Sequence, residues 1–416
     1  MRLLFLSNFY PPASRGGYEQ WCQEVAEGLR SRGHDVLVLT SRHGRDRLEG
    51  PDPAWVRREL HLEMELASLR NGLQFFTSRK ARENENLLRL RRLGESFEPD
   101  AVLIWGMWNL PRSLPALAEN LKPGRVAYYM GDYWPTLPSQ FEVYWQVPAR
   151  NWATGIPKSL LKQVAQRIMA GEEQSTLRFE RVIFPTAFMR DELKRRGVSL
   201  QETKIIYGAI DTRLYQRRNG SSCVQQDGVF SLLSVSRLTP DKGVHTGIEA
   251  LSYLRHQRDF SQLKLTIVGS GEPDYEAHLR QLARKEKIDS MVNFLGAQPK
   301  EAMPGLYQRA DVFLFTSIWP EPFGRVLVEA MASGLAVVGT TTGGAAEIMV
   351  ENENALLFAP SDAIGLAEQI ARLVESPSLR QRLTTAGRHT ALAKFDLRRM
   401  TAEIEAYLQD FVTGLG

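Results

Sequence analysis

The 416-residue chain is 43% hydrophobic and 24% charged, a composition that excludes the disordered and fibrous classes and, at this length, favours two domains over a single core. Its net charge of +4 is uneven, because residues 1–218 carry 33 Lys and Arg against 25 Asp and Glu, whereas the remainder carries 19 against 23. The basic first half suits an anionic partner, although adjustment of solubility is the commoner cause of such an imbalance.

The N-terminal stretch MRLLFLSNFYPPAS has only a short apolar run and no cleavage-like tail, so it is predicted to be a first strand and not a signal peptide. No apolar run approaches the roughly 18 residues of a membrane span. Cys22 and Cys223 lie in different halves and offer neither a disulfide framework nor a metal-ligand spacing. We therefore expect a cytoplasmic protein that is soluble or peripheral to a membrane.

In the first half, a helix is predicted over residues 18–33, with Cys22, Val25, Ala26 and Leu29 on its inner stripe. Short apolar runs predict strands at residues 2–9, 35–41, 101–106, 125–131, 181–186 and 204–208. Because these strands alternate with loops and amphipathic helices, the pattern indicates a parallel sheet built of βαβ units.

Residues 207–222 lose the apolar pattern, and this stretch ends in a Gly/Ser-rich cluster. After it, the second half repeats the alternation of strands and helices. Strands are predicted at residues 230–236, 264–271, 291–296, 311–317, 335–340 and 355–358. The sequence therefore predicts an α/β protein with two doubly wound domains. The last helix begins beyond the final strand and could either cap the second domain or cross back to the first.

Four loops that follow predicted strands carry polar residues: PPASRGG, MGDYWP, SRLTPDKG and WPEPFG. In open α/β sheets ligands bind outside the carboxyl ends of the strands. Since the loops come from both halves, we expect the site in a central cleft between the two sheets.

Two of these loops belong to the first half. Gly16 and Gly17 stand directly before the first helix, where glycines allow a phosphate to approach the backbone closely, although Gly-Gly is often only a turn. Asp132 follows a strand among aromatic residues and could bind a sugar hydroxyl or stabilise positive charge at an anomeric carbon. Alternatively, Asp132 caps a turn before Pro135.

The loop SRLTPDKG places Arg237 and Lys242 five residues apart directly after a strand. Two cations in so short a loop repel each other unless water or an anion lies between them, and a diphosphate meets that need. A solvated surface turn explains the pair equally well.

The stretch WPEPFGRVLVEAM places Glu321 before a helix that should start near Gly324 or Arg325, and Glu329 on that helix. Carboxylates that face buried strands need partners, because an unpaired buried charge costs several kcal/mol. Hydroxyls of a ligand could supply them, with a sugar at Glu321 and a ribose diol at Glu329. A structural Arg or a backbone donor is the alternative, and for Glu329 alone we favour it.

The segment between Glu142 and Glu172 contains no acid, and a helix is predicted from Pro157. The segment carries the basic residues Arg150, Lys158, Lys162 and Arg167. The helix has an apolar stripe of Leu160, Leu161, Val164 and Ile168. Such a helix suits an anionic membrane surface, where a lipid-linked acceptor would be found. The interpretation we favour is that the stripe packs on the first domain's sheet.

In order and spacing, these motifs resemble glycosyltransferase family 4, a family of retaining enzymes with the GT-B fold. The matches are Gly16-Gly17, S-R-L-x-x-x-K-G over residues 236–243, and E-P-F-G with seven residues between Glu321 and Glu329. The stretch TTTGGAAEIMVENENALLF adds Gly343, Gly344 and Glu347. The resemblance covers nearly the whole chain and is most specific in the second half.

The resemblance implies two Rossmann-like domains. Residues 1–208 would bind the acceptor, with a C-terminal helix of about 396–416 crossing back, and residues 209–395 would bind a nucleoside diphosphate-sugar. The expected reaction moves a hexose, by family frequency from UDP-glucose or another UDP-hexose, to a saccharide or lipid-linked acceptor in polysaccharide or glycolipid synthesis. Neither a cofactor nor a nucleic acid partner is expected, and two cations would replace a metal ion.

The resemblance also assigns roles to residues. Arg237 and Lys242, helped by the backbone of Gly17, would hold the diphosphate and carry the charge that grows on the leaving group. Glu321 would hold sugar hydroxyls and Glu329 the ribose diol. The implied catalytic set is Asp132, Glu321, Arg237 and Lys242, and the implied donor-binding set is Gly16, Gly17, Arg237, Lys242, Asn293, Glu321, Phe323, Gly324 and Glu329, with Asn293 near the base.

One departure from the family pattern concerns the loop MGDYWP. Many members have His directly before Asp, and here that position is Gly131. Either Asp132 and a backbone carbonyl suffice for a front-face transfer, or another group takes the place of the histidine. Two alternatives stay open: a GT-B-fold nucleotide-sugar 2-epimerase and a catalytically dead nucleotide-sugar-binding scaffold. The epimerase needs further carboxylates and a His at the sugar, and His245 is the one His in the motif loops.

Overall fold

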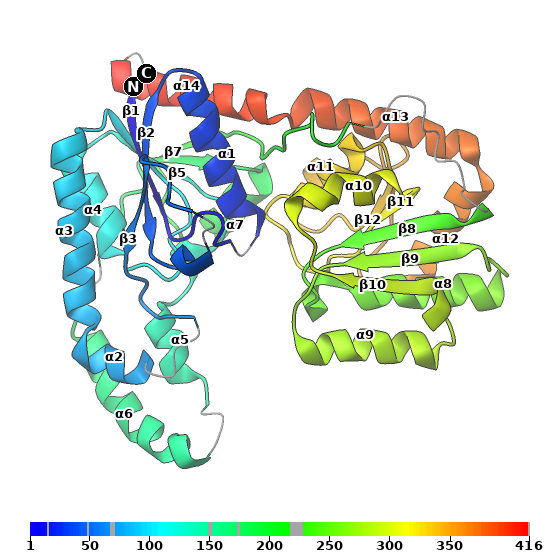
Figure 1. The fold of residues 1–416 in the computed structure, drawn as a ribbon, viewed down its shortest axis with the longest axis horizontal. Helices are drawn as coiled ribbons and strands as arrows, with labels where there is room; N and C mark the ends of the chain where they lie inside the picture. Colours follow the sequence, from blue (N-terminus) through cyan, green and yellow to red (C-terminus); the bar gives the residue numbers. More distant parts are fainter. Residues whose placement is uncertain are drawn as a thin grey trace. The chain divides into compact units, whose positions relative to one another are not determined.

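The computed structural model describes residues 1–14, 16–47, 50–66, 71–148, 152–172, 175–216 and 228–414. The chain divides into unit 1, Met1–Ile206 with Thr401–Gly416, and unit 2, Tyr207–Met400 (Figure 1). Each unit contains one parallel sheet with helices on both faces, so the predicted α/β class with two doubly wound sheets is confirmed. Arg150, Cys223 and the last part of the predicted boundary, residues 217–222, lie outside the described residues.

The sheet of unit 1 has seven parallel strands in the order β3-β2-β1-β4-β5-β6-β7. Its elements are β1 (Arg2–Ser7), α1 (Gly17–Ser31), β2 (Asp35–Ser41), β3 (Val56–Leu60), α2 (Asn71–Thr77), α3 (Arg79–Phe97), β4 (Ala101–Ile104), α4 (Ser113–Leu121), β5 (Val126–Tyr129), α5 (Gln140–Gln146), α6 (Trp152–Ala170), β6 (Arg181–Phe184), α7 (Ala187–Arg195) and β7 (Glu202–Ile205). Helices α3 and α4 cover one face of the sheet (Figure 1). On the other face lies α1, whose predicted inner stripe is buried.

The last helix, α14 (Leu397–Thr413), begins in unit 2 and continues in unit 1. Within unit 1 its residue Thr401 packs against Gly28 of α1. The carboxylate of Glu405 accepts hydrogen bonds from Arg32 Nε and His34 Nε2, each at 2.6 Å. Ion pairs and close packing thus fix the end of the chain to α1.

Strand β3 at the sheet edge was not predicted from the sequence, because its residues VRREL are mostly charged. Val56 and Leu60 are nevertheless buried, and so is Arg58, which is only 6% exposed. The Arg58 guanidinium donates to both Asp52 carboxylate oxygens at 3.0 and 3.1 Å and to the Tyr10 carbonyl at 2.9 Å. A paired arginine therefore takes a position that the apolar pattern assigns to an aliphatic residue.

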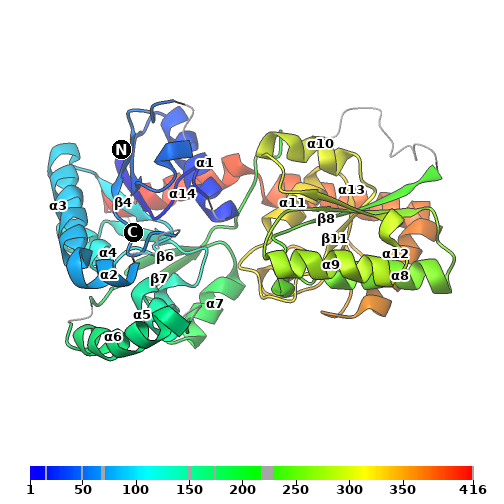
Figure 2. The same cartoon turned by 60° about the horizontal axis from the view of Figure 1, so that its bottom comes forward.

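Helices α2, α5 and α6 pack together beside the sheet around a small core of Phe75, Phe141, Trp145 and Ala165 (Figures 1 and 2). The predicted helix from Pro157 is confirmed as part of α6. The prediction that its apolar stripe packs on the sheet is wrong. Leu160, Leu161, Val164 and Ile168 are 69%, 43%, 48% and 39% exposed, because α2 and α5 contact a different side of α6.

The sheet of unit 2 has six parallel strands in the order β10-β9-β8-β11-β12-β13. Its elements are β8 (Phe230–Val235), α8 (Val244–Gln257), β9 (Leu263–Val268), α9 (Pro273–Lys285), β10 (Val292–Gly296), α10 (Met303–Gln308), β11 (Val312–Phe315), α11 (Arg325–Ala332), β12 (Ala336–Gly339), β13 (Leu356–Leu357), α12 (Ala363–Glu375) and α13 (Pro377–Lys394). Helices α10, α11 and α13 lie over one face, and α8, α9 and α12 lie over the other (Figures 1 and 2). All six strands were predicted, with ends that differ by at most three residues.

Candidate active site

The loops after β8 and β11 meet at an ion pair in unit 2. These strands are parallel neighbours, with Leu232 opposite Val312, so their carboxyl ends lie side by side although about 80 residues separate them in the chain. Lys242 Nζ donates a short hydrogen bond to Glu321 Oε1. The Ser317 hydroxyl donates to the same oxygen at 3.0 Å. The sheet register thus brings together two of the predicted site residues.

Backbone contacts hold these two loops against each other. The carbonyl of Asp241 accepts from the amides of Ile318 and Trp319 at 2.9 and 3.0 Å. The Thr316 hydroxyl donates to the Lys242 carbonyl at 2.8 Å. Gly243 has φ +61°, and a Cβ atom there would lie 2.2 Å from the Thr316 carbonyl oxygen. Only glycine fits this position without moving the backbone.

The loop after β12 joins the same arrangement through Glu321. The amide of Gly344 donates to the Glu321 carbonyl at 2.6 Å. Gly343 has φ +65°, and a Cβ atom there would lie 2.4 Å from the same carbonyl oxygen. Three loops from neighbouring strands therefore fix the position of Glu321.

The charges of this site are partly neutralised within the protein. Lys242 is 8% exposed and the Glu321 side chain 18%, so the pair is largely removed from water. Arg237 is exposed and makes no ion pair with any described residue. The second oxygen of Glu321 remains for a hydroxyl donor, and Arg237 remains for an anion.

Glu329 lies on α11 and already has protein partners. Its carboxylate accepts from Arg325 Nε at 3.2 Å and from the Tyr307 hydroxyl at 2.9 Å. Burial raises the pKa of Tyr307, and the neighbouring Glu329 carboxylate adds to this effect. The structural arginine that we favoured as the partner of Glu329 is thus present, four residues away on the same helix.

The remaining predicted residues of unit 2 differ in their relation to this site. Gly324 caps α11 with φ +111°, so the helix begins at Arg325 as predicted. Phe323 is buried, with its ring 5.6 Å from that of Phe395. Asn293 is exposed within edge strand β10, three residues before the strand ends at Gly296, and is not among the residues at the Glu321 loops.

In unit 1 the predicted residues lie where the loop after β5 meets the start of α1. Gly16 caps α1 with an extended φ of −179°, and its amide donates to the Glu19 carboxylate at 3.1 Å. A Cβ atom at Gly16 would meet nothing within 4 Å. Neither backbone strain nor crowding therefore requires glycine here, and open space lies beside the first turn that Gly17 begins.

Asp132 is partly buried beside this turn. One carboxylate oxygen accepts from the Trp134 amide at 3.4 Å. Burial raises the pKa of Asp132 to about 7, the Trp134 hydrogen bond opposes this rise, and the nearby Glu19 carboxylate adds to it. Asp132 can therefore change its protonation near neutral pH.

The Tyr18 ring explains why position 131 has no side chain. A Cβ atom on Gly131 would lie 2.7 and 2.8 Å from two carbons of this ring, and one on Gly106 would lie 3.0 Å from a third. The ring also packs against Trp105 with centroids 5.9 Å apart, and its hydroxyl donates a short hydrogen bond to the Tyr129 carbonyl. Tyr18 thus fills the space that a histidine at position 131 would need.

Sequence reasoning missed Tyr18, Glu19 and Ser317. Tyr18 and Glu19 directly follow the predicted Gly-Gly pair, and Ser317 ends the strand run before WPEPFG. Their position beside motif glycines was the available signal. Which strands are neighbours, and hence which loops meet, could not be derived from spacing along the chain.

Profiles of two protein families match the chain in tandem. "Glycosyltransferase Family 4" matches residues 15–214, and "Glycosyl transferases group 1" matches residues 224–390. The second match contains the loops that meet at Glu321. The first contains Gly16, Gly17 and Asp132.

Full-length relatives have related descriptions. A glycosyltransferase of Methanocaldococcus jannaschii, described as uncharacterized, is 30% identical over 97% of this chain and 96% of its own. The glycogen synthase of Mycobacterium tuberculosis strain H37Rv is 28% identical over 98% of this chain and 94% of its own. The crystal structure of Anabaena HepE in complex with UDP and glucose has a TM-score of 0.68 at 23% identity and covers 98% of this chain and 99% of that one. This structural likeness confirms the expected GT-B fold.

Proposed function

The chain belongs to the group 1, family 4 glycosyltransferases, a retaining family that uses nucleotide-sugar donors, and from this premise we propose that it transfers a hexose from a UDP-hexose such as UDP-glucose. The proposed acceptor is a saccharide or a lipid-linked saccharide in polysaccharide or glycolipid synthesis. The observation that carries the proposal is the meeting of three loops of unit 2 at Lys242 and Glu321. Arg237 is exposed on the same loop as Lys242, five residues before it.

Arg237 and Lys242 are proposed to bind the donor's diphosphate. The exposed guanidinium of Arg237 can donate two parallel hydrogen bonds to phosphate oxygens. Lys242 is held by Glu321 and needs no reorganisation when negative charge grows on the leaving nucleoside diphosphate, as efficient electrostatic stabilisation requires. The site thereby supplies positive charge to the leaving group from its own side chains.

The donor sugar and nucleoside are assigned to neighbouring groups. The free carboxylate oxygen of Glu321 would accept hydrogen bonds from sugar hydroxyls, and the backbone amides of Phe323 and Gly324 would donate to them. Glu329 would bind the ribose diol with the lone pairs that Arg325 and Tyr307 leave free. The base would be bound by the backbone around Asn293.

We propose that the domain of residues 1–208 binds the acceptor and that residues 209–395 bind the donor. The C-terminal helix returns to the first of these domains. Gly16 and Gly17 would let the backbone at the start of α1 approach a phosphate. Asp132 would stabilise positive charge that develops at the anomeric carbon, a role that needs its ionised form. HepE, whose crystal structures contain UDP, glucose or UDP-glucose, supports the choice of UDP and glucose as first ligands to test.

Release of UDP from UDP-glucose, followed with and without candidate acceptors, tests the proposal. A transferase releases UDP in step with a new glycosidic bond, and the acceptor increases the rate. A 2-epimerase converts the sugar and keeps the diphosphate bond in its product, whereas a scaffold binds without turnover. Sugar conversion or binding alone would replace the proposed function with one of these alternatives.

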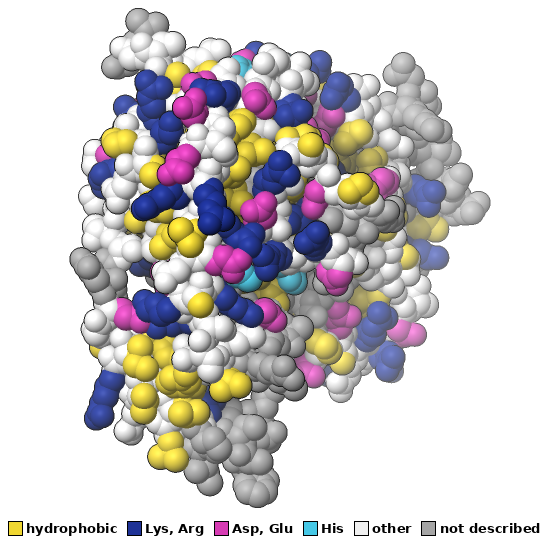
Figure 3. Space-filling view, turned by 60° about the vertical axis from the view of Figure 1, so that its left-hand side comes forward, with side chains coloured by type: hydrophobic (Ala, Val, Ile, Leu, Met, Phe, Trp, Pro, Cys, Tyr) yellow, Lys and Arg dark blue, Asp and Glu magenta, His cyan; other side chains and the backbone are white. Residues whose placement is uncertain are grey.

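A second part of the proposal concerns an anionic membrane surface. In the part of the chain that the structure describes, no helix combines the length and apolarity needed to cross a bilayer. The exposed stripe of α6 lies beside the basic residues Lys158, Lys162 and Arg167. Val143 of α5 and Val147, which directly follows this helix, are exposed as well. Figure 3 views the side of the molecule that lies on the left in Figure 1. It shows hydrophobic side chains gathered at the lower end of this side and Lys and Arg side chains across its centre. Apolar contact and positive charge are what binding to anionic lipid surfaces requires.

Co-sedimentation with anionic and neutral liposomes, at low and high salt, tests membrane binding. We expect salt-sensitive binding to anionic vesicles, and loss of it in the variant Leu160→Ser/Leu161→Ser. Ile364→Ser is the matched control, because Ile364 is an exposed aliphatic residue of unit 2. Equal recovery in the supernatant under all conditions would exclude this association.

A further inference from the structure

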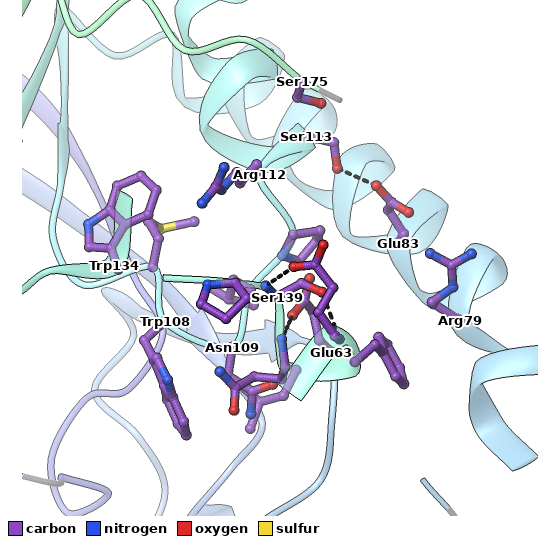
Figure 4. A pocket seen from close by; sticks show the side chains of 18 of the residues that line it. Glu63, Arg79, Glu83, Trp108, Asn109, Arg112, Ser113, Trp134, Ser139 and Ser175 are labelled. Atoms are coloured by element: carbon purple, nitrogen blue, oxygen red, sulfur yellow. Dashed lines mark hydrogen bonds between the residues drawn. The ribbon is translucent and has the colours of Figure 1, made fainter. Parts of the chain in front are cut away.

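Unit 1 contains a pocket of about 570 Å³ that the roles assigned above leave unused (Figure 4). Its walls come from the residues after β3, the first half of α3, the loops after β4 and β5, the start of α5, and the end of α6 with the residues that follow it. The volume falls in the range of small-molecule sites, which is about 300–1,000 Å³. The pocket therefore has the size for a ligand, and its lining indicates the chemistry of that ligand.

The cations along α3 at this pocket are already paired with carboxylates. Arg79 forms two hydrogen bonds with the Glu172 carboxylate, and Lys80 lies 3.1 Å from the same carboxylate. Arg82 donates to Glu65 at 3.0 Å. These ion pairs neutralise the cations of α3 at this pocket, and the remaining arginine of the lining, Arg112, is engaged by backbone carbonyls.

Three carboxylates that line the same pocket have oxygen lone pairs that no hydrogen bond between described residues uses. One oxygen of Glu63 accepts from the Gln140 amide at 2.9 Å, one of Glu83 from the Ser113 hydroxyl at 2.5 Å, and one of Glu142 from the Ser139 amide at 2.6 Å. An ionised carboxylate can accept about four hydrogen bonds, so each of the three has further lone pairs. Burial raises the pKa of Glu63 to about 7, with Glu83 and Glu142 adding to the rise. Such groups repel anions and bind hydroxyl donors.

Flat and apolar side chains complete the lining. Trp108, Pro111 and Leu137 lie among the polar groups. The guanidinium of Arg112 donates to the carbonyls of Pro135 and Leu137, each at 2.9 Å, and so fixes the loop that carries them. In Figure 4 Trp108, Arg112, Glu63 and Glu83 surround the pocket from separate segments. Apolar surfaces next to carboxylates match the C–H faces and hydroxyls of a sugar ring.

We propose that this pocket of unit 1 binds a neutral saccharide, and that this saccharide is the acceptor or the end of an acceptor chain. The assignment as acceptor rests on the proposed function, whereas the binding of a neutral saccharide rests on the pocket alone. Paired cations and free carboxylate oxygens select uncharged hydroxyl-rich ligands over phosphorylated or acidic ones.

The test uses the full chain and three probes: maltotriose and cellotriose as neutral trisaccharides and trigalacturonic acid as the acidic one. Binding is followed by ligand-observed NMR and by the fluorescence of Trp108 and the other tryptophans. A neutral trisaccharide should bind, and because it has no charge its affinity should be unchanged in about 0.5 M sodium chloride. Glu83→Ala should weaken this binding about tenfold through the lost hydrogen bonds, as should Trp108→Ala through lost apolar contact. Glu95→Gln, an exposed position on the same helix, is the matched control.

Titration of UDP into the same samples separates the two proposals. If UDP binds and neither neutral trisaccharide does, or if the acidic probe binds more tightly, the pocket assignment is overturned and the proposed function stands. Neutral binding that is unchanged in both Glu83→Ala and Trp108→Ala would also overturn it. If wild-type protein binds a neutral trisaccharide but neither binds nor turns over any nucleotide-sugar, the proposed function fails and the saccharide site remains.

Discussion

The two units have parallel sheets of similar size, but the loops that follow their strands are built differently. In unit 2 the loops after β8, β11 and β12 are short and joined by backbone hydrogen bonds, with glycines at their closest approaches. In unit 1 the segments after β3 and β5 contain α2, α5 and α6, and side chains line the pocket between them. A site held by backbone contacts tolerates little change, whereas a pocket lined by side chains can change its ligand through single substitutions.

The largest effect should come from the buried ion pair of unit 2. We expect Lys242→Ala to lower kcat/KM at least about 10²-fold, because one preorganised charge stabiliser contributes on the order of 3 kcal/mol to transition-state binding. Its melting temperature should fall too, since Glu321 is left as an unpaired, largely buried charge. Lys264→Ala, at an exposed lysine of β9, is the control. Near-normal turnover by Lys242→Ala would contradict its role at the leaving group.

Glycine substitutions test the contrast between the two units more directly. Gly343→Ala should lower both melting temperature and turnover, because the new Cβ would meet the Glu321 carbonyl 2.4 Å away at a positive φ. In unit 1, the new Cβ of Gly131→Ala would approach the Tyr18 ring, a side chain and not the backbone, so this substitution should cost less, about 1–3 kcal/mol. Gly16→Ala has open space and should leave the melting temperature unchanged. Thermal unfolding of the three variants measures this order, and equal losses at positions 343 and 131 would contradict the contrast.

The pKa of Asp132 predicts opposite effects on stability and activity. Its folded-state value of about 7 lies above the ordinary value of 3.8, so between these limits the folded protein holds a proton that the unfolded chain has lost. The contribution of Asp132 to stability therefore falls as pH rises from about 4 to about 7. Asp132→Asn should melt at a higher temperature than wild type at about pH 8, and the difference should shrink toward about pH 4.

The activity of wild type should rise with pH through about 7, because the proposed role of Asp132 needs its ionised form. Asp132→Asn should lose turnover and also this rise in kcat. Glu95→Gln, at an exposed carboxylate of α3 that lies outside both proposed sites, is the control that should keep the rise. Full turnover by Asp132→Asn with an unchanged pH profile would remove Asp132 from the mechanism.

The smallest effect is expected from Glu329. Its carboxylate is shared between Arg325 and Tyr307, so only part of its capacity serves a ribose diol. Glu329→Ala should raise the KM for the donor several-fold, by about 1 kcal/mol of uniform binding, and leave kcat nearly unchanged. A fall in kcat with unchanged KM would instead place Glu329 in the chemical step.

The sheets were largely predictable because their strands are buried on both faces and therefore appear as continuous apolar runs. Strand β3 escaped prediction since Arg58 is buried by pairing with Asp52, a contact that residue type alone does not reveal. The stripe of α6 was assigned to the wrong surroundings. Hydrophobic periodicity identifies a face of a helix, but neighbouring elements decide whether that face is covered.

The candidate site was predictable as a set of residues and not as a set of contacts. Motif order identified Lys242 and Glu321, but their pairing depends on β8 and β11 being neighbours in the sheet. We expected ligand hydroxyls as the partners of Glu321, whereas the structure gives it a lysine. For Glu329 we favoured a structural arginine or a backbone donor, and Arg325 is present as its partner. The pocket of unit 1 was not predicted, although Trp134 and Pro135 of the loop MGDYWP line it, because its walls come from six segments that only the fold brings together.

Calorimetric titration of UDP, GDP and ADP into wild type and Arg237→Ala tests the central claim, that unit 2 binds a nucleoside diphosphate through the loop after β8. Arg237 is exposed and unpaired among the described residues, so its removal should not disturb the fold. We predict that UDP binds to wild type and that Arg237→Ala binds it at least about tenfold more weakly, because charge-assisted hydrogen bonds to the diphosphate are lost. Binding of none of the three nucleotides, or equal UDP affinity in the two proteins, would contradict the account.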